Sequence, residues 1–467
     1  MAEKRNFQAI KGTRDLLPPE TELWNRVEQT AREVFGSFGF GEIRLPIFEP
    51  TELFARAVGG ETDIVSKEMY TFPEAPDSEE MKPLGSTTAD LIIRRAASTR
   101  VSLRPEATAS VCRAYIEHGM HALAQPVKLY YMGPMFRRER PQKGRYRQFY
   151  QIGVEVLEAI TPNTDATKTI GKDAAVDAEV IEMVMAYFAR LGLEGVQLDI
   201  NSIGHSAPPI GGKPECRRGY VEKLKNELEK VKDKLGADSQ RRIEMNPLRV
   251  LDSKLESEQE IIAGLPRIGD HLCADCAKHY AEVKRQLELR GVAYRENRRL
   301  VRGLDYYMRT TFEITARGLG SQNAVCGGGR YDGLVELLGG APTKGIGFAI
   351  GEDRVILSLQ EAGKGSAAQG RDVYIAWMGE KTLATAIRAA RDLRQAGFRV
   401  ELPPVEQKFG KALGQADKLG ARYALILGED EVASGQWTLK TLADGTQGKY
   451  SEAGLLEFLR KTGTLSS

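Results

Sequence analysis

The chain of 467 residues is long enough to bury a core of its own and predicts two to four domains. Its 28% charged and 42% hydrophobic residues are typical of a globular protein, and a net charge of +2 indicates no particular anionic partner. Five irregularly spaced cysteines argue against a disulfide framework, and no apolar run is long enough to span a membrane. The charged start, Met1 to Phe7, does not resemble a signal peptide, so the cytoplasm is the expected location.

The first hundred residues predict one helix and several short strands. Apolar residues recur at helical spacing from Glu20 to about Phe38. Glu42 to Pro46 follows as a strand, and its proline indicates a sheet edge or an interface. Residues 75–100 are polar and carry two prolines, which predicts an inserted loop or an extended hairpin. Strand Val101 to Arg104 then precedes a helix that opens near Pro105.

A run of cations lies between two predicted strands at 128–137 and 145–156. Its six members fall within eleven positions: Arg137, Arg138, Arg140, Lys143, Arg145 and Arg147. Such a run is usually a solvated face, but here Tyr146 and Phe149 interrupt it, which favours a groove for phosphates and a stacked base. On the returning strand Gln151, Gly153 and Glu155 share one face. A buried Gln and Glu need partners, so this face indicates a ligand site.

The composition shifts to charged helices between Gly204 and about Gly291, which predicts a helical insertion. Within it His271, Cys273, Cys276 and His279 form a compact candidate metal set, with Cys216 far away in sequence. A Cys-x2-Cys pair without a second pair is a weak zinc signal. Packed or solvent-facing thiols are therefore favoured, and no structural metal is expected.

Three segments after the insertion carry glycines or arginines. Residues 301–314 form a turn with Arg302 and a strand with two tyrosines, which could line a polar pocket or be a buried strand with an incidental arginine. Gly327 to Gly333 contains three glycines in a row, which suit either close approach of backbone to a ligand or a tight turn. Arg354 in the first turn of a helix opposes the helix dipole, so it fits either an anionic ligand or a plain surface position.

The end of the chain predicts a separate small domain. Residues 363–370 are rich in Gly, Ser and Ala and read as a linker, and beyond them three strands alternate with helical stretches. There is no Walker loop and no dinucleotide fingerprint, and none of the five histidines falls in the segments singled out apart from the metal set. The arginine-rich site therefore suits electrostatic catalysis on a phosphate better than proton shuttling.

Several segments resemble the motifs of class II aminoacyl-tRNA synthetases. The first motif is similar to the Glu20 helix with the Pro46 strand, and the second to Phe136 to Pro141 with Arg145 to Phe149. The third is similar to Gly347 to Arg354. Two further segments, Arg302 to Tyr307 and Gly328 to Gly333, look like the signatures of histidyl-tRNA synthetases. The resemblance covers nearly the whole chain and is weakest at 75–100 and in the insertion.

The resemblance implies an α+β fold with a six-stranded antiparallel catalytic sheet, flanking helices, a helical insertion and a C-terminal α/β anticodon-binding domain. The implied bounds are 1–204 and 292–362 for the two parts of the catalytic domain, 205–291 for the insertion, 363–370 for the linker and 371–467 for the anticodon-binding domain. It also implies a homodimer formed through the first motif, with no membrane association.

The activity implied by the resemblance is that of an aminoacyl-tRNA ligase. ATP with Mg²⁺ would activate L-histidine to histidyl-adenylate and pyrophosphate, and histidine would then pass to the 3' end of tRNA(His). Histidine would be bound by Glu106, Ala107, Thr108, Gln151, Glu155, Tyr306, Tyr307 and Tyr331. Within this set, Glu106, Thr108 and Gln151 would hold the α-amino group, while Glu155 and Tyr307 would read the imidazole.

The resemblance also assigns the ATP side of the site. Arg137 and Arg302 would be catalytic, flanking the α-phosphate and the attacking carboxylate. Arg145 and Arg354 would meet the outer phosphates, and Phe149 would lie against adenine. Two alternatives stay open: a regulatory subunit resembling the partner of ATP phosphoribosyltransferase, and a catalytically silent tRNA-binding module. The first typically lacks the anticodon domain and many of these arginines, and retention of the arginine set argues against both.

Overall fold

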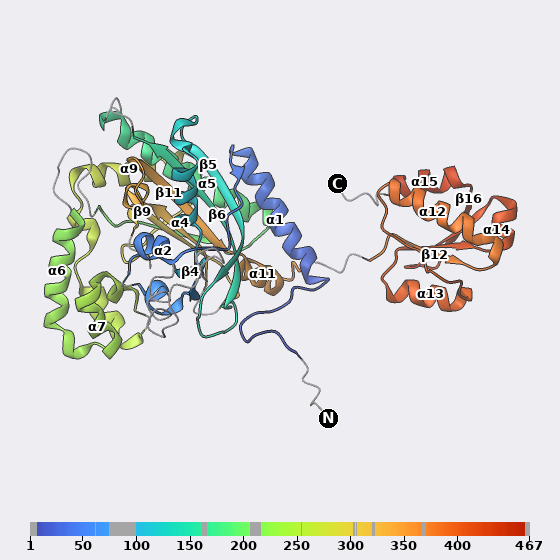
Figure 1. The fold of residues 1–467 in the computed structure, drawn as a ribbon, viewed down its shortest axis with the longest axis horizontal. Coiled ribbons are helices and arrows are strands. Elements are labelled where there is room, and N and C mark those ends of the chain that lie inside the picture. The colour runs from blue at the N-terminus through green and yellow to red at the C-terminus, as the bar shows by residue number, and fades with distance from the viewer. Residues whose placement is uncertain are drawn as a thin grey trace, which may run out of the picture. The chain divides into compact units, whose positions relative to one another are not determined.

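The computed structural model describes residues 7–60, 62–73, 100–160, 166–205, 216–253, 255–301, 304, 306–319, 323–365 and 370–462. Arg302, nearly all of the expected loop at 75–100 and half of the expected linker lie outside these residues. The chain forms two compact units, Met1–Leu16 with Leu23–Gly365, and Leu17–Glu22 with Ser366–Ser467 (Figure 1). In the described part of the chain, no helix has the length and apolar character needed to cross a bilayer.

An eight-stranded sheet forms the centre of the first unit. Its order is β1(Gly41–Glu42), β5(Val127–Phe136), β6(Gln148–Ala159), β11(Thr343–Gly351), β10(Ala324–Arg330), β9(Met308–Thr315), β7(Gln197–Ser202) and β8(Arg295–Glu296). The six inner strands are antiparallel to one another, while β1 and β8 join the edges in parallel. The antiparallel sheet implied by the class II resemblance is therefore confirmed.

Alternation along the strands divides the side chains between the two faces of this sheet. One face is covered by α1(Glu20–Ser37), α5(Ala166–Leu191), α9(Ala274–Leu289) and α11(Glu352–Glu361), and Ile152, Val154 and Val156 of β6 belong to this core. The other face packs against α2(Thr51–Val58), α4(Thr108–Glu117) and α10(Leu334–Leu337). Glu155 and Gln151, one residue out of phase with the apolar set, therefore lie on the α4 side.

A small sheet of β2(Phe48–Pro50), β4(Arg100–Leu103) and β3(Thr71–Pro73) accompanies α2. The strand expected over Glu42 to Pro46 is only two residues long, because pairing with β5 stops shortly after Glu42. Helices α6(Cys216–Lys230), α7(Ala237–Met245) and α8(Gln259–Gly264) form the insertion, a lobe with its own core that includes Tyr307 (Figure 1). Helix α9, expected within the insertion, packs instead against α5.

The second unit is an α/β domain with a five-stranded sheet. The parallel strands β13(Val400–Glu401), β12(Val373–Trp377) and β14(Tyr423–Leu427) continue into the antiparallel pair β15(Trp437–Thr441) and β16(Gln447–Tyr450). Helices α12(Leu383–Gln395), α13(Phe409–Lys418), α14(Glu429–Ser434) and α15(Glu452–Lys461) accompany it. The alternating strands and helices were predicted from the sequence, whereas the closing antiparallel pair was not.

Candidate active site

A pocket on the α4 side of the large sheet collects most of the residues singled out in the sequence. It holds about 1050 Å³ of empty space, part of it open to solvent. The predicted residues that line it are Glu106, Thr108, Arg137, Arg145, Phe149, Gln151, Glu155, Tyr306, Tyr307, Tyr331 and Arg354. Ala107 is fully buried at the N-cap of α4 and does not line the pocket. Arg302, outside the described residues, has no structural placement here.

Glycines on β11 make the room that the pocket side chains occupy. Gly347 pairs with Glu155, and a Cβ there would lie 1.9 Å from a carboxylate oxygen of Glu155 and 2.3 Å from the carbonyl oxygen of Val154. A Cβ at Gly345 would meet the ring of Tyr331 at 2.2 Å. Only a residue without a side chain fits these two positions, so the glycine-spaced strand is a requirement of the pocket wall.

Two of the three consecutive glycines of β10 also leave space that neighbouring groups occupy. A Cβ at Gly328 would lie 2.6 Å from side-chain atoms of Phe312 and Phe348, and one at Gly329 would lie 3.0 Å from the Tyr307 ring. Gly327 alone of the three lines the pocket. The space at Gly328 and Gly329 is therefore filled by the protein's own backbone and side chains, and the expectation of close approach to a ligand fits only Gly327.

Replacing Gly347 by alanine is expected to destabilise the chain by about 1–3 kcal/mol, because the added methyl forces Glu155 or the β6 backbone to move. The measurement is the midpoint of thermal or urea unfolding. Gly36→Ala is the matched control, since a Cβ at this helical position meets nothing within 4 Å. Equal unfolding midpoints for the two variants would contradict this account of the wall.

One end of the pocket is built around a buried carboxylate. Glu155 is 1% exposed, and its two oxygens accept hydrogen bonds from the Thr108 hydroxyl at 2.7 Å and the Tyr331 hydroxyl at 2.5 Å. Burial raises the pKa of Glu155 to about 8; these two hydrogen bonds oppose the shift, and the charge of Glu106 adds to it. A ligand that donates a further hydrogen bond to Glu155 therefore stabilises the ionised form of this carboxyl.

Glu106 stands beside it at the start of α4. Its carboxylate accepts the backbone N–H groups of Thr108 at 2.8 Å and Ala109 at 3.1 Å, so it caps the helix whether or not a ligand is present. Burial raises the pKa of Glu106, while those hydrogen bonds and the charge of Arg137 lower it. The side-chain oxygen of Gln151 is buried and has no hydrogen-bond partner within the described residues.

Three tyrosine rings, those of Tyr306, Tyr307 and Tyr331, also line the pocket. The ring of Tyr306 lies 4.7 Å from that of Tyr307 and 5.7 Å from that of Tyr331. Burial raises the pKa of Tyr306 and Tyr331 well above the usual tyrosine value, and the nearby carboxylates add to the shift. The hydroxyls therefore stay protonated and can both donate and accept.

Three guanidinium groups occupy the other end of the pocket. Arg137 donates from Nε to the carbonyl of Pro105 at 2.9 Å, and its guanidinium carbon lies 5.2 Å from the centre of the Phe149 ring. Arg354 donates to the carbonyl of Ala324 at 2.7 Å. Burial lowers the pKa of Arg354, and the positive charges of Arg145 and Arg137 lower it further. Mutual repulsion of this kind is what a bound polyanion would relieve.

Only part of the cation run faces this pocket. Lys143 pairs with Glu361 at 2.7 Å, and the guanidinium of Arg138 lies 5.9 Å from the Tyr70 ring. Neither lines the pocket. The run thus combines site residues with ordinary surface cations, and position along the chain did not distinguish them.

Several lining residues had no role in the sequence interpretation. Glu139 lies 3.2 Å from Arg145 and 3.8 Å from Arg137, so it orients both guanidiniums. Asp353 accepts the backbone N–H of Tyr150 at 2.9 Å. Tyr131 also lines the pocket, in the space that Gly153 leaves open. The sequence could have predicted Glu139 as a pocket residue, because it is an acidic residue within a run of arginines. No local pattern predicts Asp353 or Tyr131 as pocket residues.

Comparison with known proteins assigns the chain to a family. The family model described as Histidyl-tRNA synthetase matches residues 91–355, which is more than half of the chain. The chain belongs to the histidyl-tRNA synthetase family. A second family model, described as Anticodon binding domain, matches residues 372–462. Both assignments made from the motifs of the sequence are thereby confirmed at the level of the family.

Relatives and solved structures agree with this assignment over the whole length. A "Histidine--tRNA ligase" of Koribacter versatilis is 49% identical, with 98% of this chain and 97% of the relative covered. One of Solibacter usitatus is 50% identical, with 94% and 96% covered. The structure of apo Staphylococcus aureus histidyl-tRNA synthetase matches with a TM-score of 0.73 at 33% identity, covering 97% of this chain and 100% of that one.

One structural neighbour bears on the regulatory alternative. A Bacillus halodurans chain described as an ATP phosphoribosyltransferase regulatory subunit/histidyl-tRNA synthetase matches with a TM-score of 0.59 at 20% identity, covering 92% of this chain and 99% of that one. At that identity the likeness shows the shared fold alone. The shared fold does not distinguish a synthetase from a regulatory subunit, so the decision rests on the site residues.

Arg330 of the second histidyl signature lies away from the pocket in this family member. It is 2% exposed, pairs with Asp177 and lies 2.9 Å from Asp332. Asp177 is itself fully buried, and Nε2 of His279 lies 3.3 Å from one of its carboxylate oxygens. Arg330 therefore holds β10 against α5 by a buried ion-pair network, and the signature combines a pocket residue, Tyr331, with a structural one.

Arg330→Met is expected to destabilise the chain by about 3–5 kcal/mol, because it leaves the Asp177 carboxylate buried without its main partner. Chemical unfolding at constant pH measures the effect. Arg285→Met, which removes an exposed ion pair with Glu282, should cost less than about 1 kcal/mol. A cost for Arg330→Met as small as that of Arg285→Met would contradict the structural role.

Proposed function

We propose that this chain is a histidine–tRNA ligase that activates L-histidine with ATP and Mg²⁺ and then transfers it to the 3' end of tRNA(His). The observation that carries the proposal is the polarity of the pocket. The buried Glu155 lines the pocket beside Gly347, whereas Arg137, Arg145 and Arg354 line it beyond the Gln148 end of β6 and the Gly351 end of β11. The named relatives, 49% and 50% identical over almost their full length, support the same activity.

The carboxylate end suits a neutral imidazole, which has one donor and one acceptor. Glu155 accepts the imidazole N–H, and the Tyr307 hydroxyl donates to the other ring nitrogen. Gln151 offers its unpartnered side-chain oxygen to the α-ammonium group, and Glu106 supplies the compensating charge. The Thr108 hydroxyl already donates to Glu155, so its oxygen is left as an acceptor for the same ammonium group. An apolar amino acid would leave these buried groups without partners, which is the basis of strong rejection.

The arginine end suits the triphosphate of ATP. A carboxylate oxygen of histidine forms a bond to the α-phosphorus as the bond to the bridging oxygen breaks, and pyrophosphate leaves with its Mg²⁺. Arg137, with Arg302, stabilises the negative charge that builds on the α-phosphate oxygens. Arg145 and Arg354 bind the outer phosphates, and Phe149 packs against adenine. Because Arg137 and Arg354 are already fixed by backbone carbonyls, little reorganisation is needed in the transition state.

The proposal includes a homodimer in the cytoplasm, with the second unit binding the anticodon of the tRNA. Support for the dimer comes from three apolar side chains exposed at or beside the small sheet: Ile47 at 44%, Phe48 at 62% and Phe72 at 47%. Single apolar residues on a surface are ordinary, but Ile47 and Phe48 are consecutive and Phe72 lies on the other outer strand of the same small sheet, which favours an interface. Phe48→Lys should therefore shift the mass measured by light scattering from dimer to monomer, and an unchanged mass would count against this interface.

Histidine-dependent exchange of pyrophosphate into ATP tests the first step, and charging of tRNA with labelled histidine tests the second. Both should be positive for the whole chain and lost in Arg302→Ala. A folded Arg302→Ala chain with unchanged exchange would refute the role given to Arg302. A regulatory subunit would bind histidine without exchange, and a silent tRNA-binding module would bind tRNA without exchange.

A further inference from the structure

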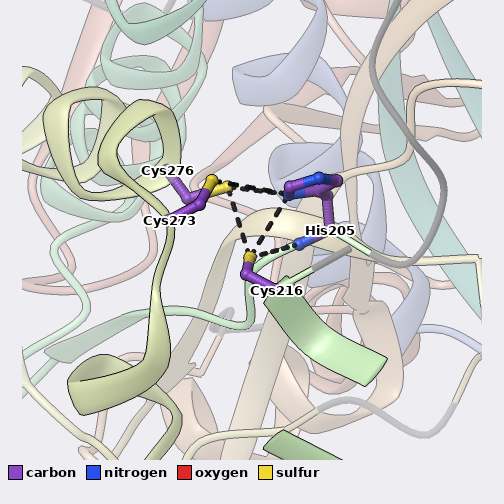
Figure 2. Close-up of side chains that lie close together, drawn as sticks. All are labelled: His205, Cys216, Cys273 and Cys276. Atoms are coloured by element: carbon purple, nitrogen blue, oxygen red, sulfur yellow. Dashed lines mark hydrogen bonds between the residues drawn. The ribbon is translucent and has the colours of Figure 1, made fainter. Parts of the chain in front are cut away.

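Four candidate metal ligands that are far apart in the sequence meet at one point of the first unit. They are His205, Cys216, Cys273 and Cys276, and their ligand atoms all lie within 4.8 Å of one another (Figure 2). His205 follows β7, Cys216 is the first residue of α6, Cys273 is the N-cap of α9 and Cys276 lies in its first turn. His205 and Cys276 are buried, and the other two are partly buried. The set is closed to bulk water on most sides.

The spacing of these atoms fits a tetrahedral ion. Zinc bonds of about 2.3 Å to sulfur and about 2.0–2.1 Å to nitrogen place two sulfurs about 3.8 Å apart and a nitrogen about 3.6 Å from each sulfur. The Cys216 and Cys276 sulfurs are 3.8 Å apart. Nδ1 of His205 lies 3.2 Å from Cys216, 3.2 Å from Cys276 and 3.9 Å from Cys273. A disulfide would require about 2.05 Å between two sulfurs.

The backbone around the set is arranged for sulfur. The N–H of His205 lies 3.5 Å from the Cys216 sulfur and donates to it. Gly204 has a φ of +63°, and a Cβ at that position would lie 2.8 Å from the Cys216 sulfur. All three cysteines lie at or near helix N-termini, Cys216 at the start of α6 and Cys273 and Cys276 at the start of α9.

We propose that His205, Cys216, Cys273 and Cys276 bind one structural zinc ion. Three thiolates and one imidazole are a donor set that selects zinc and fills all four positions, leaving none for substrate. This replaces the sequence-based expectation of no structural metal. It also corrects the ligand set: the His271 ring lies 5.7 Å from the Tyr220 ring and His279 lies 3.3 Å from Asp177, so neither belongs to it.

The ion ties the insertion to the histidine end of the pocket. Arg217, next to Cys216, donates its backbone N–H to the His205 carbonyl at 3.1 Å and its side chain to the Tyr307 carbonyl at 2.8 Å. Arg309 of β9 exchanges backbone hydrogen bonds with Ile203 and Gly204 beside His205. The cluster therefore fixes the ends of α6 and α9 against the segment that carries Tyr307. This is a positioning role, not a catalytic one.

The first test is the metal content of the full chain, purified without an affinity tag that binds metal. We expect one zinc per chain by inductively coupled plasma mass spectrometry, and background levels in His205→Ala and in Cys273→Ser. His271→Ala and Cys112→Ala are matched controls that should keep the ion, since neither residue belongs to the cluster. Zinc retained in both cluster variants, or absent from the folded wild-type chain, would overturn the proposal.

A second measurement uses the wild-type chain, so it tests the proposal even if the cluster variants fail to fold. Wild-type chain stripped with a chelator and refilled with Co²⁺ should show thiolate-to-cobalt charge transfer and the visible bands of a tetrahedral site. Alkylation under denaturing, non-reducing conditions should modify all five cysteines once the metal is removed. A Co²⁺ spectrum without thiolate bands, or a disulfide that joins Cys216 to Cys276, would rule the zinc site out. Cys273→His, which keeps a donor, should retain more metal than Cys273→Ser.

Discussion

Replacing Arg137 by alanine is expected to lower the kcat/KM of histidine-dependent pyrophosphate exchange by about 10²–10³-fold. The guanidinium is held by the Pro105 carbonyl and lies over the Phe149 ring, so it is already in place when charge develops on the α-phosphate. Its loss removes an interaction that is stronger in the transition state than in the ground state. The effect should therefore fall mainly on kcat.

Arg138→Ala is the matched control for that variant. Arg138 is the next residue in the chain and carries the same charge, yet its guanidinium lies over Tyr70 and it does not line the pocket. Its exchange rate should stay within about threefold of wild type, since surface charges act weakly. Equal losses for the two variants would mean that general positive charge, and not the position of Arg137, drives the reaction.

Replacing Glu155 by glutamine is expected to weaken histidine binding about 10- to 100-fold, since a hydrogen bond to a charged group contributes about 1.5–3 kcal/mol. The variant keeps the shape of the side chain but cannot present a carboxylate to the imidazole N–H. Titration calorimetry measures the affinity. Glu158→Gln is the matched control on the same strand, because Glu158 pairs with Lys172 and does not line the pocket. Equal affinities for the two variants would contradict the role of Glu155.

The raised pKa of Glu155 gives this binding step a pH dependence with a definite sign. In the empty pocket the carboxyl has a pKa of about 8, and an imidazole donor favours the ionised form. Binding below pH 8 therefore releases a proton, and affinity rises with pH until about 8. Calorimetry in buffers of different ionisation enthalpy measures the number of protons released on binding. Glu155→Gln should release fewer protons than the wild-type chain, because it lacks the carboxyl that loses its proton.

The same shift predicts a change in the stability of the empty chain. A carboxyl whose pKa in the folded chain lies above its unfolded value stabilises fully below the unfolded pKa of 4.5, and this contribution is lost as the pH rises through about 8. The Tm of the wild-type chain should therefore fall relative to that of Glu155→Gln between about pH 5 and 8 and change little above that. If the Tm of the two chains varies with pH in the same way, burial does not disfavour the ionised form of Glu155, and the prediction is wrong.

Local pattern was enough to predict the pocket wall on β6. The period-two spacing of Gln151, Gly153 and Glu155 predicted one polar face, and the structure places that face in the pocket. The antiparallel sheet followed from the resemblance of the motifs. By contrast, the cation run could not be divided between site and surface, because the pairing of Lys143 with Glu361 joins residues more than two hundred positions apart.

The residues of the cysteine cluster could not be predicted from their spacing in the sequence either. Sequence proximity grouped Cys273 and Cys276 with His271 and His279, whereas the fold turns both histidines to other partners. The actual neighbours, His205 and Cys216, lie sixty or more positions from Cys276. A ligand set assembled by the packing of α6 and α9 against the end of β7 is a property of tertiary structure, and spacing along the chain does not encode it.

The most direct test of the two-substrate pocket is pyrophosphate exchange by the whole chain with each of the twenty amino acids in turn. L-Histidine alone should support exchange, because only its side chain satisfies both Glu155 and Tyr307 while its carboxylate reaches the arginine end. Exchange with a different amino acid, or histidine binding with no exchange at all, would contradict the account.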